Sequence, residues 1–234
     1  MMECRREETK ENNYRKKIVL IGAGGFGREV ASIIEVLNAS TKTTHKYELL
    51  GFLDDGTQYH EGDMINGYPW LGKHEWILEH KNEVVCNCTI LNPVIKKEIQ
   101  EDLCAKGVTF ETIVAYEGFG YIGPYTEIGP GCVLYGGVTI SANCKIGAGV
   151  VMNQMVNIGH DVTIGDYTSL MPMTAISGGC TIGSEVRIGG HVFVVPQRKI
   201  GDKATVAAGS IVFTNVKAGT TVLGNPAKRL QAIE

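Results

Sequence analysis

The stretch ISANCKIGAGVVMNQMVNIGHDVTI, residues 140–164, decides the fold of this chain because an aliphatic residue recurs at every sixth position. The same step continues in both directions without a polar residue, through Ile122, Ile128, Leu134, Ile140, Ile146, Met152, Ile158, Ile164, Leu170, Ile176, Ile182, Ile188, Val194, Ile200, Val206, Val212 and Ala218. Four positions after each of these residues lies a small or β-branched residue, with Arg198 as the exception. A repeat of this length predicts a stacked, quasi-one-dimensional fold.

A six-residue period with one aliphatic and one small inward position is typical of a parallel β-helix, in which three hexapeptides make one triangular coil. Seventeen steps therefore predict a prism of just under six coils, with the aliphatic ladder filling its interior. The glycines that follow many of the aliphatic residues suit corners where a side chain would clash or where φ must be positive. The period does not determine the hand of the helix, and the usual crossover rule favours a right-handed one.

The chain before the repeat has a different pattern, in which strands and helices alternate. Residues 16–21 predict a strand, Gly22 to Gly27 a glycine turn and residues 28–38 a helix with an apolar stripe. Further strands are expected within residues 47–55, 82–90 and 108–114, and a further helix over 93–106. We therefore expect a polar tail at 1–15, a small Rossmann-like parallel α/β domain at 16–114 and a β-helix domain at 115–234.

Composition excludes several classes of protein. The net charge of −3 and the scattered Lys and Arg residues provide no basic face for nucleic acid. No apolar run reaches the roughly 20 residues of a membrane span, and the polar start lacks the apolar segment of a signal peptide. The seven cysteines are scattered, and we expect them to be reduced. These features predict a soluble, cytoplasmic protein without a membrane span.

His160 and Asp161 are the residues of the opening stretch that the repeat does not require. An imidazole has a pKa near neutral pH and can accept a proton from an attacking amine or hydroxyl, while an adjacent carboxylate stabilises the imidazolium. The alternative is that His160 is a solvated residue at a corner of the coil. On spacing alone the corner interpretation is the better supported of the two.

The repeat together with the ending LGNPAKRL resembles the hexapeptide-repeat acyltransferases, whose prisms are left-handed. With GAGGFGRE and FLDD added, the chain from Lys16 resembles a narrower group, the bacterial sugar acyltransferases that include bacillosamine-pathway and perosamine N-acetyltransferases and the sialic acid O-acetyltransferase type. The resemblance implies a homotrimer that uses acetyl-CoA, with the active site between subunits. It also implies that His160 is the general base and that Asp161 raises its basicity.

The same resemblance implies the binding residues. A nucleotide-linked sugar would be held by Gly25, Phe26, Gly27, Asp54 and Asp55, where a helix N-terminus and a strand end suit a phosphate and a ribose. Acetyl-CoA would contact Ser169, Gly178, Gly190 and Ala208. Lys228 and Arg229 could neutralise the CoA phosphates or be solvated surface charges, and Arg198 could turn outward toward the same anion. This chain has Phe26 and Ser169 at positions where the family often has histidine.

The sequence thus predicts an acetyl-CoA-dependent N-acetyltransferase of a nucleotide-linked amino sugar, in particular a 4-amino-4,6-dideoxyhexose for a surface glycan. One alternative is O-acetylation of sialic acid or another sugar. A second is a non-catalytic nucleotide-sugar-binding trimer, and a third is an NAD-binding module fused to a structural β-helix. No metal is predicted, because His160 and His191 lie at different corners and a zinc site of this fold needs three converging imidazoles.

Overall fold

The computed structural model describes residues 15–41, 43, 46–115 and 120–230, so the predicted tail lies almost entirely outside the described residues. The first part of the chain forms a sheet of order β3-β4-β2-β1-β5, in which β3 is antiparallel to β4 and all other pairs are parallel. Its strands are β1 (Lys16–Ile21), β2 (Tyr47–Leu53), β3 (Met64–Ile65), β4 (Tyr68–Gly72) and β5 (Val85–Cys88). Its helices are α1 (Gly25–Ala39), η1 (His74–Trp76), α2 (Ile77–His80) and α3 (Pro93–Ala105).

The predicted fold type of this part, a small parallel α/β domain, is confirmed, but the strand predicted at its C-terminal end is wrong. Strands β3 and β4 and the short helices between β4 and β5 were not expected. The strand expected within residues 108–114 as the last of this sheet is wrong, because its two ends have different partners. Phe110 makes an isolated bridge to Cys86, whereas β6 (Ile113–Val114) pairs with β9 of the prism. The chain therefore enters the prism before the end of that segment.

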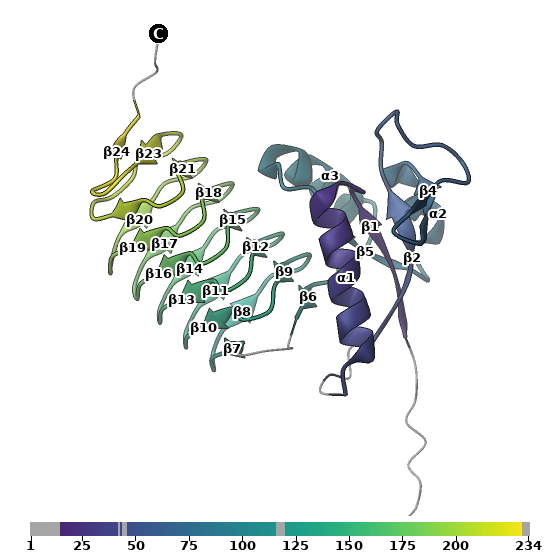
Figure 1. Ribbon diagram of the computed structural model, residues 1–234, viewed down its shortest axis with the longest axis horizontal. Coiled ribbons are helices and arrows are strands. Elements are labelled where there is room, and N and C mark those ends of the chain that lie inside the picture. Colours follow the sequence, from purple (N-terminus) through teal and green to yellow (C-terminus); the bar gives the residue numbers. More distant parts are fainter. Residues whose placement is uncertain (1–14, 42, 44–45, 116–119, 231–234) are drawn as a thin grey trace, which may run out of the picture.

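The repeat forms a three-sided prism of short parallel strands (Figure 1). One face is a six-stranded sheet of β7 (Tyr121–Ile122), β10 (Thr139–Ile140), β13 (Asn157–Ile158), β16 (Ala175–Ile176), β19 (Phe193–Val194) and β22 (Ile211–Val212). The next is a five-stranded sheet of β8 (Glu127–Ile128), β11 (Lys145–Ile146), β14 (Thr163–Ile164), β17 (Thr181–Ile182) and β20 (Lys199–Ile200). The third is an eight-stranded sheet of β6, β9 (Val133–Leu134), β12 (Val151–Met152), β15 (Ser169–Leu170), β18 (Arg187–Ile188), β21 (Thr205–Val206), β23 (Thr221–Leu223) and β24 (Lys228–Arg229).

Three corners join these sheets. Corner 1 leads from the six-stranded to the five-stranded sheet and includes residues 159–162, corner 2 leads on to the eight-stranded sheet and includes 165–168, and corner 3 leads back and includes 171–174. Residues eighteen apart lie on one column, as the pairs Ile140↔Ile158 and Ile158↔Ile176 show. A candidate functional residue can therefore be assigned to a face or a corner of the prism by counting in steps of eighteen residues.

The aliphatic ladder fills the interior as predicted until its last step. From Leu134 to Val212 every ladder residue is buried, whereas Ala218 is exposed. Val216 takes the expected place, since it bridges Ile200 and its carbonyl accepts the Gly201 N–H. The coil is thus two residues shorter here, and the prediction that the phase holds through Ala218 is wrong. Antiparallel β24 then closes the eight-stranded sheet beside β23.

The corner glycines are required mainly for space. A Cβ at Gly165 would lie 2.6 Å from the carbonyl carbon of Gly183, one coil further on, although Gly165 has no positive φ. The left-handed conformation falls two residues later in each hexapeptide, where Asn143, Asp161 and His191 have φ values of 61°, 58° and 57°. Asn, Asp and His are among the side chains that tolerate this region best. These three residues therefore suit the corner, although Met155, Tyr167 and Met173 adopt the same conformation at equivalent positions.

The first part of the chain packs on the eight-stranded sheet and on corners 2 and 3, at the end of the prism where β6 and β9 lie (Figure 1). At corner 2, Lys97 of α3 pairs with Glu185 at 3.1 Å. At corner 3, Tyr135 donates to a carboxylate oxygen of Glu29 at 2.8 Å. Among the described residues no hydrogen bond, ion pair or ring contact joins this part to corner 1. Helices that could cross a lipid bilayer are absent from the described ranges.

Candidate active site

His160 and Asp161 lie at corner 1 on the turn between β13 and β14. The imidazole Nδ1 is 2.7 Å from Asp161 Oδ2, and the two side chains are 71% and 56% exposed. The hydrogen bond from His160, and after it one from Asn143, holds the pKa of the Asp161 carboxyl below its usual range. An ionised Asp161 can only accept a hydrogen bond, so a neutral His160 must be the Nδ1–H tautomer, which leaves the Nε2 lone pair free. Nε2 has no hydrogen-bond partner within the described part of the protein, so it is available to a substrate.

Gly178 follows His160 by one coil and leaves room for its ring. A Cβ at Gly178 would lie 2.6 Å from His160 Nε2 and 2.8 Å from its Cε1. The sequence predicted that Gly178 contacts acetyl-CoA. The structure places it beside the imidazole, where the missing side chain also keeps the surroundings of Nε2 open.

The other positions predicted for acetyl-CoA lie elsewhere on the same chain. Ser169 belongs to β15 on the eight-stranded sheet and is 6% exposed, at the edge of a groove of about 290 Å³ that also contains Leu91. Gly190 and Ala208 lie eighteen residues apart on corner 3. A single chain therefore does not bring Ser169, Gly190 or Ala208 together with His160.

The C-terminal end of the prism has a polar groove of about 390 Å³ that contains Lys228 and Arg229. Lys217 lines the same groove and was missed by the sequence prediction, because it follows the shortened coil. Arg198 lies two coils along corner 1 from Asp161, and its Nε donates to the Pro196 carbonyl at 3.0 Å. Its guanidinium is thus turned outward, as expected for a group that is costly to bury unpaired.

The glycine turn connects β1 to α1, and its geometry is set by backbone contacts. Gly22 donates to the Leu53 carbonyl at 2.7 Å, and Thr89 Oγ1 donates to the Gly22 carbonyl at 2.8 Å. A Cβ at Gly27 would overlap the Gly22 carbonyl oxygen, whereas a Cβ at Gly24 or Gly25 would meet no atom within 4 Å. The first turn of α1 therefore presents its backbone to open space, which is the arrangement that suits an anion at a helix N-terminus.

The side chain of Phe26 is buried against the prism. It is 8% exposed, and its ring stacks on Tyr135 with centroids 6.0 Å apart and planes at 24°. The ring therefore packs into the contact between α1 and corner 3. The backbone of Phe26 remains part of the glycine turn.

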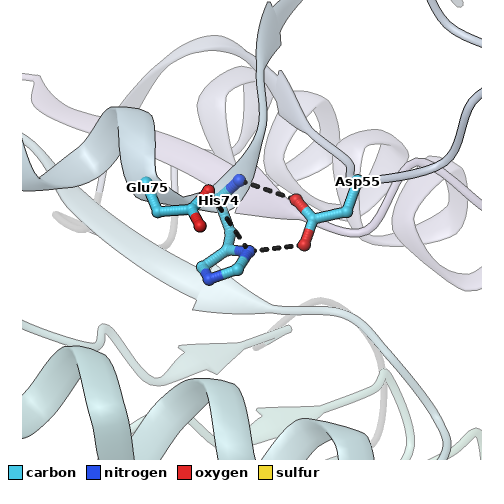
Figure 2. Close-up of side chains that lie close together, drawn as sticks. All are labelled: Asp55, His74 and Glu75. Carbon is cyan, nitrogen blue, oxygen red and sulfur yellow. Dashed lines mark hydrogen bonds and ion pairs between the residues drawn. The ribbon is translucent and has the colours of Figure 1, made fainter.

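The two aspartates at the end of β2 have separate partners. Asp54 Oδ2 accepts the Ala23 N–H at 2.7 Å and its Oδ1 accepts the Gly56 N–H at 2.8 Å, so this carboxylate shapes the glycine turn. Asp55 accepts the His74 backbone N–H at 2.9 Å and lies 2.5 Å from the His74 Nδ1 (Figure 2). Asp55 thus joins the end of β2 to the start of η1.

Glu75 lies beside this pair, with a carboxylate oxygen 3.8 Å from His74 Nδ1 (Figure 2). One ligand atom from each of Asp55, His74 and Glu75 lies within 4.8 Å of the others. Both carboxylate oxygens of Asp55 already accept hydrogen bonds from His74. We therefore interpret these three side chains as a structural contact between two loops. His74 was missed by the sequence prediction, since nothing in the spacing of residues 56–74 identifies it.

Comparisons with known proteins agree with this architecture. Residues 17–103 match the model of the PglD N-terminal domain, and residues 120–154 match the bacterial transferase hexapeptide model, of six repeats. The acetyltransferase domain of PglB from Neisseria gonorrhoeae FA1090 superposes with a TM-score of 0.81 at 28% identity, covering 92% of this chain and 100% of that one. In complex with acetyl coenzyme A, the same domain gives 0.80 at 27% identity, covering 93% and 100%.

A curated relative, the GDP-perosamine N-acetyltransferase of Escherichia coli O157:H7, is 31% identical over 147 residues, which span 62% of each chain. The fold and the repeat thus define a Rossmann-like N-terminal domain followed by a left-handed parallel β-helix of hexapeptide repeats, as predicted. The chain is similar to the PglD N-terminal domain family over its first part, and along its length to acetyltransferases such as the GDP-perosamine N-acetyltransferase and the PglB acetyltransferase domain.

Proposed function

We propose that this protein transfers the acetyl group of acetyl-CoA to the amine of a nucleotide-linked amino sugar. The observation that carries the proposal is the His160–Asp161 pair, with Nδ1 held at 2.7 Å and Nε2 free at an exposed corner. The relatives that are named as sugar N-acetyltransferases or bound to acetyl coenzyme A supply the substrate class. Within that class, a 4-amino-4,6-dideoxyhexose is the acceptor that we favour.

In the proposed reaction the sugar amine attacks the thioester carbonyl, the new C–N bond forms and the C–S bond breaks. His160 Nε2 accepts the proton that the amine must lose, and the proton then passes to the departing CoA sulfur. Asp161 stabilises the imidazolium while it carries the charge. No covalent enzyme intermediate and no metal ion are needed, because the thioester is already activated.

The positions of the predicted binding residues support an active site shared between subunits of a homotrimer. The glycine turn belongs to the part that packs on the eight-stranded sheet, whereas His160 lies at corner 1. Ser169, Gly190 and Ala208 also lie away from corner 1. We propose that corner 1 of one subunit faces these residues of its neighbour, so that acetyl-CoA lies between them beside Gly178.

The remaining binding residues follow from the same proposal. The diphosphate of the sugar nucleotide would accept from backbone N–H groups of Gly25, Phe26 and Gly27, with Asp54 and Asp55 at the ribose or base side. Lys228 and Arg229 would neutralise the CoA phosphates at the end of the prism. Since both substrates are cytoplasmic metabolites, the proposal places the enzyme in the cytoplasm.

A panel of UDP-, GDP- and dTDP-linked amino sugars, together with free sialic acid, tests the proposal. We expect acetyl-CoA consumption with at least one nucleotide-linked amino sugar and a product that is heavier by one acetyl group and stable to mild base, as an amide is. An alkali-labile product would indicate O-acetylation instead. Tight binding of a nucleotide sugar without turnover on any acceptor would favour the non-catalytic trimer.

A further inference from the structure

Asn143 lies one coil before Asp161 on the same column of corner 1. Its Nδ2 donates to Asp161 Oδ1 at 3.1 Å, while the other carboxylate oxygen, Oδ2, lies 2.7 Å from His160 Nδ1. Each oxygen of Asp161 therefore has its own side-chain partner. The three side chains form one chain of hydrogen bonds that ends at the free Nε2 of His160.

We propose that Asn143 is a positioning residue for the acetyl transfer: its amide fixes the Asp161 carboxylate, which in turn fixes the imidazole of His160. The proposal rests on the proposed function of His160 and extends it to a residue that touches neither substrate. It predicts that loss of the Asn143 amide slows the chemical step without weakening the binding of either substrate.

The exposure of the pair explains why a third residue is needed. His160 and Asp161 are adjacent in sequence and more than half exposed, so water competes for both partners of their hydrogen bond. Asp161 has backbone support, since its N–H donates to the Ala142 carbonyl at 3.1 Å, but this bond leaves the carboxylate free to rotate. The Asn143 amide removes that freedom, because it holds the oxygen that His160 does not use.

The contact is specific to this coil rather than a general feature of the corner. The other positions of the same column are Tyr125, Gly179 and Gln197, and none of them has a side-chain hydrogen bond within the described ranges. The charge of Asp161 also reaches Cys144, a buried thiol beneath the corner. Burial and, to a lesser extent, that charge raise the pKa of Cys144. The Asn143 amide is neutral and adds no charge of its own.

The test uses Asn143→Gly and Asn143→Asp in the full-length protein, with Lys203→Gly as the control. Glycine keeps the left-handed backbone at φ 61° without strain and removes only the amide. Lys203 has the same conformation, with φ 59°, at corner 2. For Asn143→Gly we expect kcat to fall about ten-fold with both KM values unchanged, a part of the roughly 10²- to 10⁴-fold that a general base contributes. Lys203→Gly should match the wild type.

The pH profiles of kcat distinguish positioning from structural damage. In Asn143→Gly the Asp161 carboxylate is no longer held in place and stabilises the imidazolium less. The acidic limb of the kcat profile should therefore move to lower pH. In Asn143→Asp the added negative charge favours the imidazolium, so the acidic limb should move to higher pH. Opposite shifts in two folded variants support the proposal. An unchanged kcat in Asn143→Gly, in a protein that His160→Ala inactivates, would overturn it and leave the proposed function intact.

Discussion

The imidazole of His160 fills the space that a side chain at Gly178, one coil further on, would need, since a Cβ at Gly178 would lie 2.6 Å from Nε2. Gly178→Ala should therefore displace the ring while leaving the prism folded. We expect kcat to fall at least about ten-fold, because a base moved by about 1 Å loses much of its effect. Steady-state kinetics with both substrates measure this loss.

Gly190→Ala is the matched comparison, because the added Cβ would approach only the Pro172 carbonyl oxygen, at 3.2 Å. Gly190 lies on corner 3 and is predicted to contact acetyl-CoA. This variant should raise KM for acetyl-CoA with little change in kcat. Equal effects of both substitutions on kcat would contradict the steric explanation.

His160→Ala should lower kcat by about 10²-fold or more, the range in which general bases contribute. Because the side chain of His160 is 71% exposed, assembly and thermal stability should be retained. Turnover, analytical ultracentrifugation and thermal unfolding check the three parts of this expectation. Wild-type turnover would remove His160 from the proposed mechanism.

Two glycines of the same turn should respond in opposite ways to an added methyl group. Gly27→Ala should lose the fold of the first part of the chain or destabilise it by several kcal/mol, because the Cβ overlaps the Gly22 carbonyl oxygen. Gly25→Ala should fold as well as the wild type, since its Cβ meets no atom within 4 Å. If a diphosphate lies against this backbone, Gly25→Ala should weaken the binding of the nucleotide sugar at least about ten-fold. Calorimetric titration measures that affinity, and thermal unfolding measures both stabilities.

Lys96 is buried at the contact between α3 and the prism, and its Nζ has no hydrogen-bond partner within the described residues. Burial lowers the pKa of Lys96, while the nearby thiols of Cys88 and Cys132 partly oppose that shift. The unfolded chain then binds more protons than the folded one, so the contribution of Lys96 to stability rises with pH until the unfolded pKa near 10.5 is reached.

Lys96→Met removes this penalty and should raise the free energy of unfolding at pH 7 by about 1–3 kcal/mol. The gain should shrink as the pH rises toward 10.5, because the wild-type amine is neutral in both states only above the unfolded pKa. Chemical denaturation at several pH values measures the difference, with Lys97→Met as the control. Lys97 is partly exposed and pairs with Glu185, so its substitution should cost stability at neutral pH.

The prism was predictable because its period is read directly from the sequence. Every coil needs an aliphatic side chain at the positions of Ile158 and Ile164, so these residues recur with the period. The same counting places His160 at a corner. The count fails near residue 213, where the last coil is two residues shorter and leads into the antiparallel pair of β23 and β24. Residues 108–114 were assigned to the wrong sheet because a short apolar segment pairs equally well with either part of the chain, and only tertiary contacts decide.

Only part of the candidate site could be proposed from the sequence. The His160–Asp161 pair follows from the residue types and from the resemblance. Asn143 could have been found by counting back eighteen residues from Asp161, once the coil length was known. Lys217 and His74 carry no such signal, because they lie where the chain departs from a period. The packing of Phe26 on Tyr135 joins residues more than one hundred positions apart, which no local pattern reveals.

The shortened coil at residues 213–216 and the antiparallel β24 have a consequence for how separate molecules meet. A prism that ended on a full coil would expose three rows of unpaired backbone N–H and C=O groups, in the same register as every inner coil. The first coil of another molecule could continue those rows, and such an addition repeated many times would build a fibre. After the shortened coil, β24 pairs with β23, and Gly224 and Ala227 bond to Ile211 of β22, so two of the three rows are already occupied and the prism terminates its own growth.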